Sequence, residues 1–458
     1  MHERLQRLLS EPRHLAVICG GAVSGSEAAA FCAARGVSAI VLEQNVRPYG
    51  KIEDGLPRWH DKLRAKEYER IDQNLDHPDV YFVPQTKLGS ELGLEVARGW
   101  GASTVLLANG AWRDRPLPVP DVEQYVDKGL VYQNPLVYWF NHYEEPGYRG
   151  PRYELCDDAI VVGGGLASVD VVKIINLELY RSALRARGIE VSIVEMEHAG
   201  IPTTLQKRGQ SAEALGVRGC TLYYRRRVRD MPLAFAKANA TPEQLEKTGA
   251  VREKMVKILE DKFLVRVQAC SAPIGAVVEG GRMVGVRFRR TEMQGSKLVE
   301  LPGSEYEARS NLIVSSIGSV PEPIAGVPLT GELYDYASWD TGAVRGLPGV
   351  FGLGNVLTGK GNIRESRDNA EEIAQLVVRD YLGLSEAARG DAAATAIAQG
   401  MHETAREQVA PVIESAIRRA KVPVERLSRI AQAIEGRWQA AGYGGSYAGW
   451  IAQHKPSA

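Results

Sequence analysis

Two short glycine-rich segments carry the clearest chemical potential in this chain of 458 residues. The first runs from Gly20 to Gly25 and the second from Gly163 to Ser168. In both, an apolar run precedes the glycines and a helical pattern follows them. A strand, a tight turn and a helix in this order aim backbone amides at an anion such as a pyrophosphate, because the helix amino terminus is partly positive. The pair therefore predicts two dinucleotide sites.

The first turn has the form G-x-A-x-x-G, with Ala22 in the middle, where its methyl group narrows the approach of the backbone to a pyrophosphate. Glu43 ends the next apolar run 18 residues after Gly25, at a position suited to binding ribose hydroxyls. A tight turn without a ligand is the alternative for so degenerate a motif. The strand before it, the helix after it and the acid together favour a dinucleotide.

The second turn has the form G-x-G-x-x-S, and two interpretations of its nucleotide remain. Glu195 and Glu197 close the segment EVSIVEMEH, which we interpret as an extra strand and which would suit the free ribose of NAD. The three arginines after GCTLYY would instead suit the 2′-phosphate of NADP, because guanidinium groups bind phosphate through paired hydrogen bonds. We favour the arginines over a solvated charge run. They are Arg225, Arg226 and Arg227.

The elements around these turns predict an α/β protein with two Rossmann-like, three-layer dinucleotide-binding domains. The short runs at 103–111 and 310–319 end in Asn-Gly and Ile-Gly turns, typical of strands that stop at a cofactor crevice. We expect the first sheet to resume after Ser310, so that the second domain is inserted in the first. The expected segments are 1–115 with 311–382 for the first domain, 116–310 for the second, and 383–458 for a helical carboxyl-terminal extension.

Composition excludes several classes of protein. Lys and Arg number 56, as do Asp and Glu, which argues against a nucleic-acid binder. The longest run of apolar and small residues, Ala159 to Val169, is too short for a membrane span, and the charged amino terminus lacks a secretory signal. The five cysteines are far apart, so we expect no metal site and a reducing, cytoplasmic location.

Several motifs then resemble one family. PYGKIEDGLPRWH, from Pro48 to His60, resembles the stretch after the FAD-binding unit of adrenodoxin reductases and bacterial NADPH:ferredoxin reductases. LVYWFNHYEEP, GGGLASVD and GVFGLGNVLTGKGNI resemble that family's later motifs, the last being its closing flavin motif. YYRRRVRDMP is similar to a segment of the related glutamate synthase small subunit. The resemblance runs from about residue 14 to 380.

The resemblance implies bound FAD and NADPH, with His60 and Asp170 as candidate catalytic residues near the meeting point of the two rings. Structural alternatives are a bond from His60 to Asp61 or a backbone carbonyl, and an ordinary helix-start role for Asp170. Asn355 departs from the family, which has tryptophan there. The implied FAD residues are Gly20, Ala22, Ser24, Gly25, Glu43, Gly50, Gly110, Gly354, Asn355, Gly361, Asn362 and Ile363. The implied NADPH residues are Gly163, Gly165, Leu166, Ala167, Ser168, Arg225 and Arg226.

The activity implied is NADPH:ferredoxin oxidoreduction, in which hydride passes to FAD and single electrons pass to a ferredoxin-type carrier. Two alternatives are an electron-input subunit of a larger complex and a redox-sensing module with little turnover. Clustered basic residues between Arg58 and Arg70, with Arg364 and Arg367, could dock an acidic carrier or simply be solvated. The tail aromatics Tyr443, Tyr447 and Trp450 could cap the flavin, but we expect them to anchor the carboxyl terminus.

Overall fold

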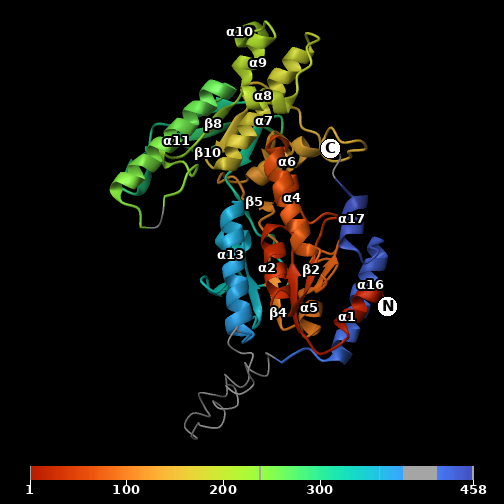
Figure 1. The fold of residues 1–458 in the computed structure, drawn as a ribbon. Coiled ribbons are helices and arrows are strands. Elements are labelled where there is room, and N and C mark those ends of the chain that lie inside the picture. The colour runs from red at the N-terminus through yellow and green to blue at the C-terminus, as the bar shows by residue number, and fades with distance from the viewer. Residues whose placement is uncertain (1, 237–238, 360–361, 385–419, 456–458) are drawn as a thin grey trace. The chain divides into compact units, whose positions relative to one another are not determined.

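The computed structural model describes residues 2–236, 239–359, 362–384 and 420–455 (Figure 1). The chain divides into two compact units. Unit 1 holds residues 1–53, 62–112 and 320–458, and unit 2 holds residues 54–61 and 113–319. The sequence places the insertion at 116–310, whereas contacts also assign the short segment 54–61 to unit 2.

Unit 1 is built on a sheet in the order β18-β19-β20-β4-β1-β2-β3. The five strands from β20 to β3 are parallel, and their residues are almost all buried, as expected for a sheet covered on both faces. Helices α2 (Val23–Ala33) and α13 (Ile363–Leu376) pack against each other (Figure 1). The strands are β1 (His14–Cys19), β2 (Val37–Leu42), β3 (Val80–Val83), β4 (Thr104–Leu107), β18 (Tyr336–Ser338), β19 (Ala343–Val344) and β20 (Val350–Gly352).

Unit 2 is built on a second sheet, parallel throughout, in the order β6-β14-β7-β8-β9. Its main helices are α6 (Gln133–His142), α7 (Leu166–Arg185) and α11 (Pro242–Phe263). The α/β class is therefore confirmed, with two Rossmann-like sheets, of which the second is parallel throughout and the first is parallel in five of its seven strands. The strands are β6 (Leu130–Tyr132), β7 (Ile160–Gly163), β8 (Thr221–Tyr223), β9 (Arg266–Gln268) and β14 (Ile313–Ser316).

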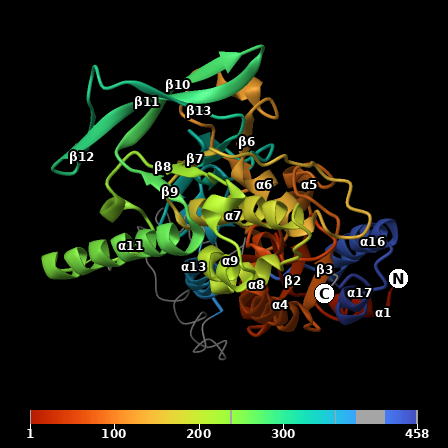
Figure 2. The ribbon, with the colours of Figure 1, turned by 90° about the horizontal axis from the view of Figure 1, so that it is seen from above.

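An antiparallel sheet in unit 2 was not expected from the sequence. It is drawn at the upper edge of Figure 2 and includes the long hairpin of β10 (Ser271–Glu279) and β11 (Arg282–Gln294). Strands β12 (Lys297–Glu300) and β13 (Tyr306–Arg309) pair with β11. The pattern of β11 alternates buried and exposed positions over much of its length, as expected for a sheet with one covered face.

Two expectations about strands are wrong. The run 310–319 contributes β14, which pairs with β6 and β7 in the second sheet rather than returning to the first. The segment EVSIVEMEH forms helix α8 (Ile193–Ala199), and not a strand. Ser192 caps this helix by accepting a hydrogen bond from the Glu195 amide, and the buried Ile193 and Met196 have helical spacing. Helices α9 (Ile201–Lys207) and α10 (Ala212–Leu215) follow.

The carboxyl-terminal extension contributes α16 (Val424–Ala441) and α17 (Tyr447–Gln453) to unit 1. Helix α16 packs beside α1 (Glu3–Leu8) (Figure 1). The helical pattern expected between 385 and 419 lies outside the described residues. No helix in the described part of the chain combines the length and apolar character needed to cross a bilayer.

Candidate functional site

The first glycine turn joins β1 to α2. Gly20 has a φ of 99°, and a Cβ atom there would lie 2.6 Å from the Ala108 carbonyl oxygen at the end of β4. A Cβ atom on Gly25 would overlap the carbonyl oxygen of Gly20. Both positions therefore require glycine for α2 to approach the sheet this closely. The first turn of α2 has neither a side-chain cap after Ala22 nor an acidic residue, so its amides suit an anion.

Glu43 lies directly after β2 and is buried. Its Oε2 accepts a hydrogen bond from the amide of Gly21 at 2.8 Å, and its Oε1 accepts one from the amide of Asn45 at 2.9 Å. The carboxylate is thus fixed between the glycine turn and the loop after β2. This is the place at which Rossmann-like folds bind a ribose.

The family-implied glycines also gather around this turn. Gly50 has a φ of 50°, and a Cβ atom there would lie 2.9 Å from the Cβ atom of Ala22. Gly110, with a φ of 64°, follows β4 in the same unit. A Cβ atom on Gly354 would overlap the side chain of Ser24 in the first turn of α2. These segments therefore meet at the amino end of α2.

The closing motif continues from Gly354 into two helices. Asn355 begins α12 (Asn355–Thr358), and Asn362 caps α13 by accepting a hydrogen bond from the Glu365 amide at 2.7 Å. Ile363 is the first residue of α13, while Gly361 lies outside the described residues. Ser24 Oγ donates to the Ser366 carbonyl oxygen at 3.3 Å and so joins α2 to α13.

The sequence indicates Asn109 only as part of an Asn-Gly turn, and the structure adds a second role for its side chain. Its Nδ2 donates to the Tyr334 hydroxyl at 3.0 Å, and that hydroxyl donates to the Glu322 carbonyl oxygen at 2.7 Å. Because the Tyr334 hydroxyl donates its only proton to Glu322, it can only accept from Asn109. The Nδ2 atom of the Asn109 amide must therefore face Tyr334. Asn109 Oδ1 is then buried without a hydrogen-bond partner among the described residues. An orphan acceptor next to the glycine turn fits a ligand that brings a donor.

The second turn joins β7 to α7 in unit 2. Ser168 Oγ donates to the Ser316 carbonyl oxygen at 2.8 Å, so this small residue packs α7 onto the sheet rather than facing a ligand. Gly165 has open space where a Cβ atom would be. Helix α7 begins at Leu166 and Ala167 with no side-chain cap and no acid in its first turn. Its free amides fit a pyrophosphate.

The two interpretations of nucleotide choice are separated by the strand order. Strand β8 lies next to β7. The residues after β8 therefore occupy the place from which Rossmann-like folds contact the ribose 2′-hydroxyl of NAD or the 2′-phosphate of NADP. Glu197 belongs to α8 and pairs with Lys173 at 2.5 Å, while Glu195 is exposed on the same helix. No strand ends at either glutamate, because both lie on a helix. The NAD-type interpretation, which required a strand there, is therefore wrong.

The arginines after β8 differ in their partners. Arg227 is held by Asp230 through two hydrogen bonds of 2.8 and 3.0 Å. Arg225 is exposed, and the Nε atom of Arg226 is buried without a hydrogen-bond partner among the described residues. Two of the three guanidinium groups are therefore placed to take an anion.

His60 and Asp170 are brought together within unit 2. The His60 Nε2 atom lies 3.6 Å from Asp170 Oδ1, which is an ion-pair distance when the imidazole is protonated. His60 ends the short turn η1 (Arg58–His60), whose Trp59 is buried against Phe140 of α6. Lys173 of α7 lies over the Trp59 ring at 4.7 Å. Trp59 therefore fixes the turn that carries His60.

The same segment is held by His142, which the sequence reasoning did not single out. Its Nε2 lies 3.0 Å from Asp54 Oδ1, and its Nδ1 lies 2.9 Å from Glu145 Oε1. Burial lowers the pKa of His142, but the hydrogen bonds and charges of the two carboxylates outweigh it and raise the pKa above its ordinary value. The nearby Asn141 Nδ2 donates to the Leu56 carbonyl oxygen at 3.1 Å.

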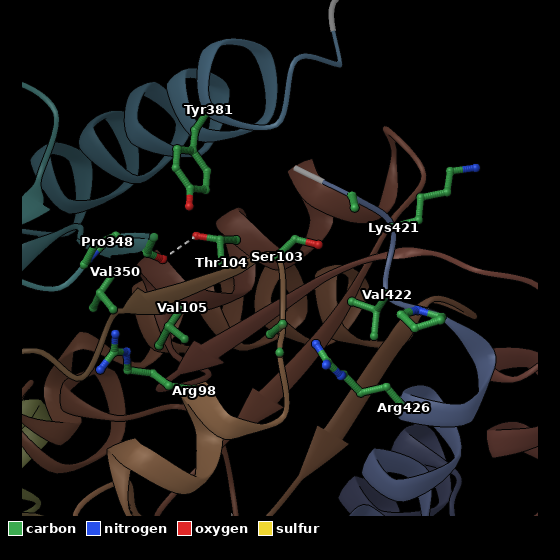
Figure 3. A pocket seen from close by; sticks show the side chains of 15 residues that line it. Arg98, Ser103, Thr104, Val105, Pro348, Val350, Tyr381, Lys421, Val422 and Arg426 are labelled. Atoms are coloured by element: carbon green, nitrogen blue, oxygen red, sulfur yellow. Dashed lines mark hydrogen bonds between the residues drawn. The ribbon is translucent and has the colours of Figure 1, made fainter. Parts of the chain in front are cut away.

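A cavity of about 550 Å³ lies elsewhere in unit 1, between the start of β4, the start of β20 and the segment before α16 (Figure 3). Thr104 Oγ1 in its wall donates to the Gly349 carbonyl oxygen at 3.0 Å. The cavity opens at the amino ends of parallel strands, whereas the glycine turn lies at their carboxyl ends. It is therefore separate from the dinucleotide site. Its cations are Arg98, Lys421 and Arg426.

No family profile matches the chain. It is 21% identical over 353 residues to the mitochondrial NADPH:adrenodoxin oxidoreductase of Arabidopsis thaliana, with 70% of each chain covered. A stretch of 185 residues, 40% of this chain and 23% of the relative, is 30% identical to a cinnamate reductase of Clostridium sporogenes. The structure matches FprA of Mycobacterium tuberculosis in complex with NADPH with a TM-score of 0.61 and 18% identity, covering 92% of this chain and 100% of that chain.

The likeness to FprA shows the fold, and the likeness to the plant oxidoreductase covers 70% of this chain. In sequence and in fold, the chain is therefore similar to the adrenodoxin oxidoreductase and FprA, and the resemblance indicated by its motifs is confirmed.

Proposed function

We propose that this chain is an FAD-dependent oxidoreductase that takes electrons from NADPH and delivers them to a ferredoxin-type iron-sulfur carrier. The observation that carries the proposal is the pair of glycine turns, one in each unit, that open onto helices without caps. The similarity to an NADPH:adrenodoxin oxidoreductase and to FprA, described in complex with NADPH, supports it.

FAD would be held in unit 1, with its pyrophosphate at the amino end of α2 and its ribose at Glu43. The close packing of α2 on β1, the uncapped amides and the orphan Asn109 oxygen fit this group. Bound flavin would supply the conversion of a hydride, which carries two electrons, into two single-electron transfers. Gly50, Gly110, Gly354, Asn355, Gly361, Asn362 and Ile363 complete the proposed set.

NADPH would be held in unit 2, with its pyrophosphate at the amino end of α7 and its 2′-phosphate at Arg225 and Arg226. Gly163 and Ser168 let α7 approach the sheet, and Gly165, Leu166 and Ala167 offer the amides of its first turn. Neither Arg225 nor Arg226 has an acidic side chain bonded to it among the described residues, unlike Arg227. Both are therefore available to a phosphate.

His60 and Asp170 would act beside the nicotinamide. The imidazole is partly exposed, so it can contact a ligand, and its Nε2 atom lies 3.6 Å from the Asp170 carboxylate. Since hydride transfer to a flavin depends chiefly on position, we assign His60 the role of orienting the ring and donating a hydrogen bond. Asp170 would then hold the orientation of the imidazole ring.

Several of the basic residues that could dock a carrier are paired with acids where the structure describes them. Arg70 and Arg367 both pair with Glu27, and Arg58 pairs with Glu144. A solvated, internally paired surface accounts for these charges. We therefore propose the ferredoxin-type carrier from the likeness to the adrenodoxin oxidoreductase and not from this face.

The five cysteines are all free, which supports the proposed cytoplasmic location.

The test is a reductase assay on the purified protein. We expect bound flavin in the absorption spectrum, oxidation of NADPH, and reduction of cytochrome c that rises when ferredoxin is added. One NADPH should reduce two molecules of the one-electron carrier. A protein that stays colourless after FAD is supplied, or that oxidises no NADPH with any acceptor, contradicts the proposal.

A further inference from the structure

The loop of residues 45–50, here called the ribose loop, lies directly on the first glycine turn. The amide of Asn45 donates to Glu43, the proposed ribose acid. A Cβ atom on Gly21 would lie 2.9 Å from the Cβ atom of Pro48, which shows how closely the loop covers the turn. Movement of this loop therefore changes the walls of the proposed FAD site.

Helix α17 holds the ribose loop from its other side. The indole Nε1 of Trp450 donates to the Val46 carbonyl oxygen at 2.7 Å, a bond between residues 404 positions apart. Arg47 Nη1 donates to the His454 carbonyl oxygen at 2.9 Å, immediately after the same helix. Trp450 is 5% exposed, so its bond is shielded from water.

A carboxylate extends this connection. Asp72 of α4 (Asp61–Leu75) accepts a hydrogen bond from the Tyr447 hydroxyl at 2.6 Å and from the Tyr49 hydroxyl of the ribose loop at 3.1 Å. Burial raises the pKa of Asp72 from its ordinary value, against the opposing effect of the two hydroxyls. The loop and α17 thus share one partly buried acceptor.

We propose that α17 is a brace that holds the ribose loop in the conformation that binds FAD. This inference rests on the proposed function, because it assumes FAD at the first turn. A loop fixed before binding loses less conformational freedom when the ligand arrives, so the affinity rises with the fraction of molecules in the competent conformation. The tail aromatics Tyr447 and Trp450 accordingly anchor the extension and strengthen cofactor binding without touching the cofactor.

The test compares two tryptophans of the extension. Trp450→Phe removes the bond to the ribose loop, whereas Trp438→Phe removes an equivalent bond from Trp438 Nε1 to the Phe82 carbonyl oxygen in β3, 2.8 Å long. Both variants lose one hydrogen bond from an indole to a backbone carbonyl and part of a buried ring. We expect similar decreases in Tm of the apoprotein. Only Trp450→Phe should raise the Kd for FAD, by about fivefold to tenfold, measured by quenching of flavin fluorescence.

A second pair of variants covers the possibility that a tryptophan variant does not fold. Tyr447→Phe removes the hydroxyl bonded to Asp72, and Tyr443→Phe alters a neighbouring buried ring that faces Trp438 and Trp450. We expect weaker FAD binding for Tyr447→Phe and unchanged binding for Tyr443→Phe. Parental Kd values in both Trp450→Phe and Tyr447→Phe, or equal losses in their controls, overturn the brace. A parent protein that binds no FAD overturns the proposed function itself.

Discussion

Replacement of Arg226 by alanine tests which nucleotide the second site selects. The buried Nε of Arg226 has no hydrogen-bond partner among the described residues, so a 2′-phosphate would supply the missing acceptor. A hydrogen bond to a charged group contributes about 1.5 to 3 kcal/mol, which corresponds to about a 10-fold to 150-fold change in affinity. We therefore expect Arg226→Ala to raise the Kd for NADPH by that factor. NADH, which lacks this phosphate, should be unaffected.

The neighbouring arginines serve as controls. Arg227 is bonded to Asp230 through two hydrogen bonds, so Arg227→Ala should leave the preference for NADPH unchanged. Arg225 is exposed, and an exposed ion pair contributes at most about 1 kcal/mol, or about a fivefold effect. Stopped-flow reduction of the flavin by NADPH and NADH measures all three variants. If Arg226→Ala weakened both nucleotides equally, or Arg227→Ala had the larger effect on NADPH, the assignment would be refuted.

Three further outcomes are expected. Gly25→Ala places a methyl group onto the Gly20 carbonyl oxygen and should lower the free energy of unfolding by about 2 to 3 kcal/mol. Gly165→Ala places its methyl group in open space and should change the free energy of unfolding little. Urea titration of the apoprotein compares the two variants. The pKa of His142 is raised in the folded protein, so its stabilisation is fully present below the pKa of the unfolded chain and is lost as the pH rises through the pKa of the folded protein. His142→Gln should therefore flatten the dependence of the free energy of unfolding on pH. His60→Gln should slow flavin reduction by NADPH severalfold without releasing FAD, and an unchanged rate would return His60 to a structural role.

The parts of the fold that repeat a local pattern could be predicted from the sequence. Each glycine turn is preceded by a fully buried strand, β1 or β7, and followed by an uncapped helix, and all three signals lie within a short stretch of chain. The position of Glu43 after β2 follows from the same local order. Hydrophobic periodicity and turn chemistry are sufficient there, because neighbouring residues determine the conformation.

The errors arose where local patterns are ambiguous. Alternation of Val191, Ile193 and polar residues favoured a strand, but Ser192 caps a helix that buries Ile193 and Met196 on one side. For β14, the strand itself was predicted, but its sheet was not. Its register with β7, from Ile313 opposite Ile160 onward, depends on contacts between distant segments, which composition and spacing do not encode.

At the site, too, the sequence gives the type of each residue but does not give its partner. Consecutive arginines after β8 look alike in the sequence, yet one is bound to Asp230 and the next leaves a buried Nε without a hydrogen-bond partner among the described residues. Glu197, once a candidate for binding ribose, instead neutralises the buried Lys173. A charged side chain becomes a candidate ligand when the fold leaves its hydrogen-bonding capacity unused. The packing of distant segments therefore decides which charged residue can bind a ligand and which one is structural. A single substitution tests each of these assignments.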